Sequence, residues 1–475
     1  MTESLVQIKF GTDGWRAVIA REFTFANVER VAQAYADFLS RETGSGKQPF
    51  VVIGFDRRFL SEKFAARTAE VLVANGFKIA LFTEAQPTPL VSWAVKELGA
   101  AGGVMITASH NPANFNGFKI KAPWGGSAAP ETTHEVEQLV DANTPKKATV
   151  ADDGHQLLEP AIARYREQIA SYVDLERLKN ANGKVIVDPM HGSAGRWVES
   201  FLTGGNLSVE TIRDSRDPLF GGVNPEPIDQ NLAPLKQRVV ETGALVGLAT
   251  DGDADRVGAV DERGQTMTMH DVVPLMLLHL ARARKMTGAV VVTVSQSVLT
   301  KRIANAMGLK VYETPIGFKY IAELMLKEDI LLGAEESGGI GVKGHIPERD
   351  GVLNSLLFLE AIVHAGKPPS EMLAELHREF GEFHFGRRDL HMPVGRGQEL
   401  VAQLSQNPPA KFASFDVTKV ETMDGAKLIF DDESWLLLRQ SGTEPVLRIY
   451  SEATSVAKMN TLLDAGVAAT ALNHA

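Results

Sequence analysis

The chain has 475 residues, of which 44% are hydrophobic and 23% are charged, which is enough apolar material for the cores of about three or four domains. Its formal net charge is −10, so the chain as a whole gains nothing from long-range attraction to nucleic acid or to an anionic membrane surface. The absence of cysteine excludes disulfides, thiolate nucleophiles and cysteine-ligated zinc.

The chain also lacks the sequence features that direct proteins to membranes. Its N-terminal residues have no basic flank followed by an apolar core, so we expect no secretory signal. The longest apolar segments, such as residues 272–280, are too short to span a bilayer. We therefore expect a cytoplasmic protein, a monomer or a homodimer, without membrane or nucleic-acid partners.

Hydrophobic periodicity predicts alternating strands and helices over most of the chain. The predicted strands are at residues 50–55, 78–82, 103–107, 184–188, 245–249, 257–261, 288–294, 310–313 and 330–333. The predicted helices are at residues 25–40, 64–75, 91–98, 161–173, 272–284, 297–307, 320–327 and 352–364. This alternation predicts α/β domains, whose functional loops gather at the carboxyl ends of the strands. After about residue 386, short strands and a final helix predict a smaller α+β domain.

A loop that carries reactive side chains follows the predicted strand at residues 103–107. Asn-Pro and Asn-Gly pairs break the backbone there, so Ser109 and His110 lie on a loop at the end of a strand. Such loops present catalytic side chains on a rigid scaffold. Two interpretations stay open: Ser109 is a nucleophile, or the loop is a polar turn that ends the strand. Ten residues after Ser109, Lys119 is either an acid/base group or a surface charge.

An acidic loop lies between the predicted strands at residues 245–249 and 257–261. Its three carboxylates, on Asp251, Asp253 and Asp255, occupy alternate positions and repel one another unless a cation neutralises them. Oxygen ligands of this kind suit Mg²⁺ or another hard cation, and a catalytic Mg²⁺ usually completes its shell with water and substrate phosphate. An EF-hand is excluded, because an arginine occupies the position of the required glycine and the flanking segments are predicted strands. The alternative is a solvated acidic hairpin without a metal.

Two later loops carry groups suited to a phosphorylated sugar. Residues 439–445 combine an arginine, two hydroxyl groups and a glycine turn, with Arg448 beyond, which together suit a phosphate; the alternative is a turn without a ligand. Residues 333–339 carry paired acids and a serine that could accept hydrogen bonds from sugar hydroxyls; the alternative is a solvated loop.

Taken together, these four segments resemble the signatures of the α-D-phosphohexomutase family, which includes phosphoglucomutases, phosphomannomutases and phosphoglucosamine mutases. The resemblance covers essentially the whole chain and implies three similar α/β domains with mixed sheets and a smaller α+β C-terminal domain around a central cleft. It implies a phosphoserine loop in a domain at residues 1–154 and a metal-binding loop in a domain at residues 155–262. It also implies a sugar-binding loop in a domain at residues 263–385 and a phosphate-binding loop in a domain at residues 386–475.

The resemblance further implies roles for individual residues. Ser109 would carry a phosphate, and this phosphate would contact Mg²⁺ held by the metal ligands Ser109, Asp251, Asp253 and Asp255. The catalytic residues that it implies are Ser109, Lys119, His110, Arg256 and Arg16. The substrate-binding residues that it implies are Thr314, Gly317, Lys319, Glu335, Ser337, His345, Arg349, Arg439, Ser441, Gly442, Thr443 and Arg448.

The activity that the resemblance implies is an isomerase reaction, the reversible interconversion of glucose 1-phosphate and glucose 6-phosphate. Glucose 1,6-bisphosphate would be its intermediate and activator. Residues 314–319 and 345–351 resemble the phosphoglucomutase branch, so we expect glucose phosphates as substrates. The alternatives are a phosphomannomutase, a dual phosphomannomutase/phosphoglucomutase and a phosphoglucosamine mutase. A phosphoserine-dependent sugar phosphatase and a non-catalytic sugar-phosphate-binding protein also stay open.

Overall fold

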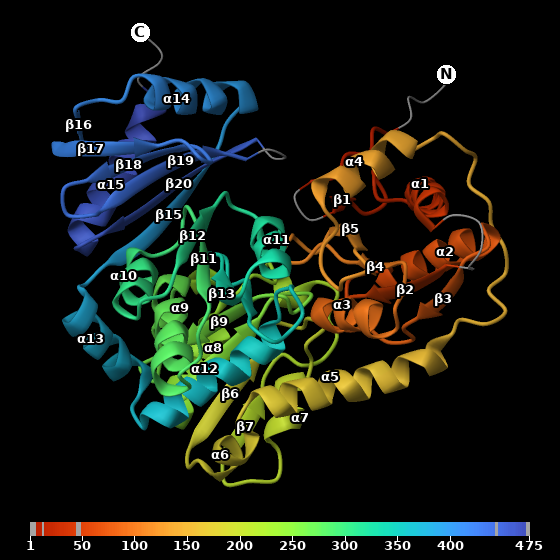
Figure 1. Cartoon of the computed structure of the whole chain (residues 1–475), viewed down its shortest axis with the longest axis horizontal. Coiled ribbons are helices and arrows are strands. Elements are labelled where there is room, and N and C mark those ends of the chain that lie inside the picture. The colour runs from red at the N-terminus through yellow and green to blue at the C-terminus, as the bar shows by residue number, and fades with distance from the viewer. Residues whose placement is uncertain (1–5, 12–13, 44–48, 442–444, 472–475) are drawn as a thin grey trace. The chain divides into compact units, whose positions relative to one another are not determined.

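The computed structural model describes residues 6–11, 14–43, 49–441 and 445–471, and the chain divides into two units (Figure 1). Unit 1 comprises Met1–Thr266 and Gly338–Pro369, and unit 2 comprises Met267–Ser337 and Ser370–Ala475.

The first sheet of unit 1 has the strand order β1-β5-β4-β2-β3. Its parallel strands β2 (Phe50–Phe55) and β4 (Gly102–Ile106) are apolar and buried, as expected for strands that are covered on both faces. The antiparallel strand β5 (Phe115–Lys121) pairs with β4. The other elements of this domain are β1 (Trp15–Val18), β3 (Lys78–Leu81), α1 (Phe25–Thr43), α2 (Ser61–Ala74), α3 (Thr88–Glu97) and α4 (Pro130–Leu139).

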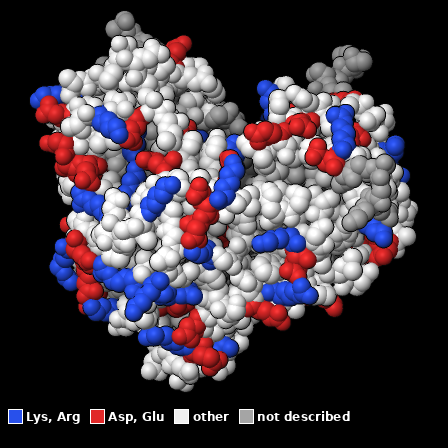
Figure 2. Space-filling model, viewed as in Figure 1, with Lys and Arg blue, Asp and Glu red and all other residues white. Residues whose placement is uncertain are grey.

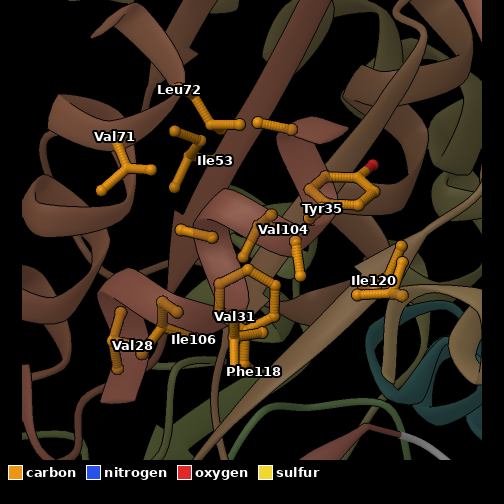
Figure 3. Close-up of a cluster of buried hydrophobic side chains, with 14 of the residues drawn as sticks. Val28, Val31, Tyr35, Ile53, Val71, Leu72, Val104, Ile106, Phe118 and Ile120 are labelled. Atoms are coloured by element: carbon orange, nitrogen blue, oxygen red, sulfur yellow. The ribbon is translucent and has the colours of Figure 1, made fainter. Parts of the chain in front are cut away.

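The core of this domain is a cluster of aliphatic and aromatic side chains (Figure 3). Tyr35 of α1 meets Phe118 of β5 edge to face, with ring centroids 6.5 Å apart. Val31 of α1 and Val104 of β4 belong to the same buried cluster. This packing fixes β4 and β5, and thereby the loop between them.

The second sheet of unit 1 has the order β10-β9-β8-β6-β7. Its strands β6 (Lys184–Asp188), β7 (Ser208–Thr211) and β8 (Val246–Thr250) are parallel, and β9 (Val257–Val260) runs antiparallel to β8. Helix α12 (Gly351–Ala365) packs against β8 and β9 and is apolar on almost all sides, which agrees with its deep burial. The remaining elements are α5 (Leu158–Tyr172), α6 (Leu175–Asn180), α7 (Trp197–Leu202), α8 (Ala233–Thr242), β14 (Ile340–Val342), and β10 (Thr266–Met267) at the boundary between the units.

Unit 2 contains a parallel sheet and an antiparallel sheet. In the parallel sheet, β11 (Ala289–Thr293) lies between β12 (Val311–Thr314) and β13 (Ile330–Ala334). The antiparallel sheet has the order β15-β20-β19-β18-β17-β16. Its strands are β15 (His384–His391), β16 (Lys411–Phe412), β17 (Phe415–Glu421), β18 (Ala426–Phe430), β19 (Trp435–Gln440) and β20 (Val446–Ala453). The helices of unit 2 are α9 (Met269–Leu278), α10 (Val298–Ala306), α11 (Phe318–Lys327), α13 (Pro369–Phe380), α14 (Val394–Gln406) and α15 (Val456–Ala469).

A buried cluster joins the two sheets of unit 2. Val294, after β11, belongs to one apolar cluster with Trp435 and Tyr450 of the antiparallel sheet. The buried carboxylate of Glu452 accepts hydrogen bonds from Trp435 Nε1 at 3.0 Å and from Ser297 Oγ at 2.6 Å. Apolar packing and buried hydrogen bonds therefore hold the two domains of unit 2 together.

The predicted fold class, α/β domains followed by an α+β domain, is confirmed, and the predicted domain boundaries stay predictions. Several elements differ from the sequence-based expectation, among them β5, β14 and α9. Strands β5 and β14 occupy residues for which we predicted no strand, and β14 lies between the predicted strand at residues 330–333 and the predicted helix at residues 352–364. Helix α9 begins earlier than predicted, because Thr268 and Asp271 form a capping box at its start, and it ends in a π-helical turn at His279–Ala283.

Two further observations concern the surface. Among the described residues, no helix combines the length and the apolar character that crossing a membrane requires. On the face shown in Figure 2, acidic and basic side chains are interspersed.

Candidate active site

The loop after β4 holds Ser109 in an uncommon backbone conformation. Ser109 has a φ of 51°, in the left-handed region that residues other than glycine rarely adopt. Its amide donates a hydrogen bond to Thr107 Oγ1 at 2.9 Å, and its side chain is almost completely buried. The loop therefore fixes the direction of one hydroxyl group instead of exposing it on an open turn.

The loop between β8 and β9 gathers three carboxylates. Asp251, Asp253 and Asp255 are fully buried, and one oxygen of each lies within 4.8 Å of the others. Gly252 lets this acidic loop approach the Ser109 loop, because a Cβ atom at this position would lie only 2.5 Å from the Ser109 carbonyl oxygen. The acidic loop is therefore no solvated hairpin.

Ser109 meets the acidic loop through Asp251. Ser109 Oγ donates a hydrogen bond to Asp251 Oδ2 at 2.8 Å. Asp251 Oδ1 accepts hydrogen bonds from the amides of Asp255 (3.0 Å) and Arg256 (3.1 Å). Burial, followed by the charges of Asp255 and Asp253, raises the pKa of Asp251 well above its usual value. The carboxylates therefore destabilise one another's charged forms when no cation is bound.

The acidic loop fits a metal cation. Asp255 Oδ1 is buried and accepts no hydrogen bond from the residues that the structure describes. A cation would supply a partner for this oxygen and would reduce the repulsion among the three carboxylates. Three carboxylate ligands would leave positions on a hard cation for water and phosphate oxygens. The trio can therefore bind a metal.

Lys119 extends from β5 to two of these carboxylates. Its Nζ lies 2.9 Å from Asp253 Oδ2 and 3.4 Å from Asp255 Oδ2, and its side chain is 1% exposed. Thr88 Oγ1 donates a second hydrogen bond to Asp253 Oδ2, at 2.7 Å. Lys119 is thus a buried amine held at the acidic loop, and the interpretation as a surface charge is wrong.

Three arginines and one histidine predicted for the site also lie near these groups. Arg349, just before α12, places Nη2 2.9 Å from Asp255 Oδ2. Arg256 is buried beside the acidic loop, and nearby carboxylates outweigh its burial and raise its pKa. Arg16 Nη1 donates a hydrogen bond to Asn111 Oδ1 at 2.6 Å, and His110 Nδ1 lies 3.4 Å from Ser109 Oγ. Unit 1 therefore brings an amine and guanidinium groups to the acidic loop and to the loop that carries Ser109.

His345 lies in a different environment from the one predicted. Its ring stacks on Trp93 with centroids 5.8 Å apart, and its side chain is 1% exposed. Its Nε2 lies 2.9 Å from Asp350 Oδ2, which also accepts a hydrogen bond from Tyr165 at 2.8 Å. These contacts surround the ring, so the predicted contact between His345 and a substrate would require them to break.

The predicted sugar-binding residues of unit 2 lie at the carboxyl ends of its parallel strands. Glu335 is buried and Ser337 is half-buried, and both follow β13. Thr314 is buried at the end of β12. Gly317 precedes α11 with a φ of 136°, and Lys319 lies in the first turn of that helix. This edge of the sheet therefore collects polar groups from two strands and one helix.

Asp424 connects these groups to the predicted phosphate-binding loop. Its Oδ2 accepts a hydrogen bond from the Ile316 amide at 2.8 Å, and its Oδ1 accepts one from Arg439 Nε at 2.9 Å. Arg439 stands directly opposite Arg448 on the neighbouring strand, so both side chains leave the same face of the sheet. Two guanidinium groups with one carboxylate suit an anion. Ser441 is buried beyond Arg439, whereas Gly442 and Thr443 lie outside the described residues.

The sequence analysis missed several buried charged residues of unit 1. Lys121 and Glu348 form an ion pair of 2.7 Å with no exposed side-chain surface. Lys121 lies two positions after Lys119 on β5 and therefore on the same face. The alternation of Phe118, Lys119, Ile120 and Lys121 was the signal that could have identified both the strand and this face. Arg58, directly after β2, was also missed.

Comparison with known proteins matches the chain to one family over four domains. Its profiles are described as phosphoglucomutase/phosphomannomutase alpha/beta/alpha domains I, II and III and C-terminal domain. They match residues 7–147, 163–264, 270–380 and 401–469, respectively.

Individual relatives are similar over nearly the whole chain. A phosphoglucomutase/phosphomannomutase of Thermococcus kodakarensis is 32% identical over 96% of this chain and 97% of its own length. A phosphoglucosamine/phosphogalactosamine mutase of Sulfurisphaera tokodaii is 30% identical over 96% of this chain and 97% of its own length. The crystal structure of a putative phosphomannomutase from Thermus thermophilus is 36% identical and superposes with a TM-score of 0.85, covering 98% of this chain and 99% of that chain.

Proposed function

The chain belongs to the phosphoglucomutase/phosphomannomutase family, whose members are isomerases, and we propose that it interconverts hexose 1-phosphate and hexose 6-phosphate through a phosphate on Ser109. One observation carries this proposal. The hydrogen bond of 2.8 Å from Ser109 Oγ to Asp251 Oδ2 places a buried hydroxyl at the edge of a carboxylate trio that fits a cation. A hydroxyl in this position is suited to accept and release a phosphoryl group.

The first half-reaction transfers the phosphoryl group from the enzyme to the sugar. The free hydroxyl oxygen of the substrate forms a bond to phosphorus, and the bond from phosphorus to Ser109 Oγ breaks. Lys119, in its neutral form, takes the proton of the attacking hydroxyl, and His110 gives a proton to Ser109 Oγ. The distance of 3.4 Å between His110 Nδ1 and Ser109 Oγ supports this pairing.

The second half-reaction returns a phosphoryl group to the enzyme. Ser109 Oγ attacks the other phosphate of the hexose bisphosphate and gives its proton to His110. The sugar oxygen that leaves takes a proton from Lys119, so both residues regain their starting protonation states. Arg349 and Arg256 would lower the energy of the charge on the phosphoryl oxygens during both transfers.

We propose that Asp251, Asp253 and Asp255 hold Mg²⁺, because all three ligands are hard oxygens and their number is small. When bound there, Mg²⁺ would withdraw charge from the oxygens of the transferred phosphoryl group. The proposed metal site would also include an oxygen on Ser109.

Unit 2 supplies a candidate site for the phosphate that does not react. A hexose bisphosphate has two phosphates, so a mutase needs a second group of anion-binding residues. We propose Arg439, Arg448, Ser441, Gly442 and Thr443 for this phosphate. We propose Glu335, Ser337, Thr314, Gly317 and Lys319 for the sugar hydroxyls. Binding energy from the distant phosphate can then orient the reacting end of the sugar.

The names of the relatives favour the alternative substrates over glucose phosphates alone. The two relatives with the highest identities given above carry mannose in their names, in one case together with glucose. We therefore propose an enzyme that acts on both mannose and glucose phosphates. Such breadth has a physical basis, because the two sugars differ only in the orientation of one hydroxyl group. A glucosamine phosphate is the second candidate, supported by the relative from Sulfurisphaera tokodaii.

A comparison of three substrates tests this proposal. Values of kcat/KM for mannose, glucose and glucosamine 1-phosphates are measured with Mg²⁺ and catalytic glucose 1,6-bisphosphate. We expect mannose and glucose to agree within about tenfold and glucosamine to be slower by about 100-fold or more. A faster reaction with glucosamine 1-phosphate would replace the proposed substrate by the second candidate. Release of free phosphate without isomerisation would identify a phosphatase instead.

A further inference from the structure

One buried arginine holds the backbone of the loop that carries Ser109. Arg58 follows β2, and its side chain has no exposed surface. Its Nη2 donates hydrogen bonds to the carbonyl oxygens of Ser109 (2.7 Å) and Asn111 (2.6 Å). Its Nη1 donates to the carbonyl oxygens of Pro112 (2.7 Å) and Phe115 (3.1 Å). A single guanidinium therefore binds four carbonyl groups between residues 109 and 115.

Asp56 completes this arrangement. Its Oδ2 lies 3.2 Å from Arg58 Nε and accepts a hydrogen bond from Thr107 Oγ1 at 2.6 Å. Thr107 Oγ1 in turn accepts the amide hydrogen of Ser109 at 2.9 Å. Asp56 and Arg58 therefore reach both backbone polar groups of Ser109, its N–H through Thr107 and its C=O directly.

These contacts restrain a backbone that favours another conformation. Ser109 has a φ of 51°, and a serine without such restraints prefers a negative φ. A change in this angle would turn Oγ away from Asp251, which it now meets at 2.8 Å. Both Nη atoms of Arg58 donate hydrogen bonds to backbone carbonyl oxygens of the Ser109 loop, and Nε lies 3.2 Å from Asp56 Oδ2 without a hydrogen bond. Because the side chain has no exposed surface, this guanidinium holds the loop from within the protein.

We propose that Arg58 and Asp56 are positioning residues that aim the Ser109 hydroxyl at the acidic loop for phosphoryl transfer. This inference rests on the proposed function, because the aim of Oγ matters only if Ser109 exchanges phosphate. A merely structural role predicts less folded protein with normal turnover per folded molecule. A positioning role predicts slow transfer in protein that is fully folded, since a displacement of about 1 Å can reduce a rate about 100-fold.

The variant Arg58→Lys separates these two roles. It keeps a positive charge beside Asp56 but replaces the planar fork of donors by one ammonium group. We expect kcat per folded molecule to fall about 100-fold and KM to change less than about threefold. The matched control is Arg57→Lys, since the neighbouring Arg57 donates a hydrogen bond to the carbonyl oxygen of Asp214 and not to the Ser109 loop. The kcat of Arg57→Lys should equal that of the wild type.

The direct measurement is the uptake of phosphate by Ser109 from glucose 1,6-bisphosphate, followed by intact mass. Wild-type protein should take up one phosphate, and Arg58→Lys should do so about 100-fold more slowly. Uptake by Arg58→Lys at the wild-type rate would overturn the inference and leave the proposed function intact. A wild-type protein that takes up no phosphate would overturn the proposed function, and the inference with it.

A second variant decides the question if Arg58→Lys does not fold. Thr107→Val removes the hydroxyl between Asp56 and the Ser109 amide and preserves the volume of the side chain. Its control is Thr68→Val in α2, which removes a buried hydroxyl that donates to the Phe64 carbonyl oxygen at 3.0 Å. We expect slow phosphate uptake in Thr107→Val and normal uptake in Thr68→Val. Phosphate uptake at equal rates in Thr107→Val and Thr68→Val would overturn the inference.

Discussion

Replacement of Lys427 by methionine should remove a pH dependence from the stability of unit 2. Lys427 lies on β18 and is only 4% exposed. Its Nζ donates a hydrogen bond to the Val294 carbonyl oxygen at 2.6 Å and lies 4.7 Å from the centroid of the Trp435 ring. Glu313 is 3.5 Å away. Burial, with a smaller effect of the nearby Lys301, lowers the pKa of Lys427 from 10.5 to about 8.

The sign of the effect follows from the numbers of bound protons. Below pH 8, Lys427 is protonated in both the folded and the unfolded chain, and burial of its charge destabilises the folded state. Between pH 8 and about 10.5, the unfolded chain binds more protons, so the free energy of unfolding rises with pH. At 1.36 kcal/mol per pH unit, the shift of the pKa corresponds to a destabilisation of the folded state by about 3 kcal/mol. The free energy of unfolding should therefore rise by about 2 kcal/mol between pH 8 and pH 10.

Urea unfolding at pH 8 and at pH 10 measures this difference. The free energy of unfolding of the wild type should rise, relative to that of Lys427→Met, by about 2 kcal/mol between the two pH values. Lys419→Met is the matched control, because Lys419 lies on the neighbouring strand with a side chain that is 63% exposed. The free energy of unfolding of Lys419→Met should change between the two pH values as that of the wild type does. Parallel pH profiles of the wild type and Lys427→Met would refute the argument from burial.

Substitutions at three residues test the proposed mechanism. Ser109→Ala should lower kcat by about 10⁴-fold or more with an unchanged circular dichroism spectrum, because it removes the atom that carries the phosphate; turnover near that of the wild type would remove Ser109 from the mechanism. Asp253→Asn should weaken Mg²⁺ binding by at least about tenfold in isothermal titration calorimetry, and an unchanged affinity would place the ion elsewhere. Arg439→Ala should raise KM for hexose 1-phosphates about 10- to 100-fold and change kcat less, since it removes a charge-assisted hydrogen bond. Arg439→Lys should recover part of this loss, and an unchanged KM in Arg439→Ala would exclude this arginine from the phosphate site.

The loops that end β4 and β8 could be predicted from the sequence because local signals define them. Turn-forming pairs follow the apolar strand before Ser109, and alternating aspartates follow the strand before Asp251. Such signals predict that a residue lies on a loop at the end of a strand. They contain no information on the 2.8 Å contact between the two loops, which depends on how two sheets of unit 1 pack together.

The burial and the contacts of other site residues could not be predicted from local sequence, because their environment comes from distant segments. Lysine side chains are usually exposed, and the burial of Lys119 becomes favourable only because another domain supplies the carboxylates of Asp253 and Asp255. Arg58 binds carbonyl groups, whose positions no side-chain pattern encodes. The environment of His345 was not predicted either, because its motif resembles a binding segment whereas the fold surrounds its ring with Trp93 and other buried groups. Its predicted contact with a substrate stays a prediction.

The charges buried around the acidic loop bear on how metal and phosphate act together. Asp251, Asp253 and Asp255 are buried together, and burial with their mutual repulsion raises the pKa of Asp251. A phosphoserine at Ser109, with a charge of about −2, would add negative charge to this region of low dielectric constant, and a divalent cation would offset that charge. Under the proposed function, phosphorylation of Ser109 should therefore strengthen binding of the cation, and the cation should favour the phosphorylated enzyme by the same factor.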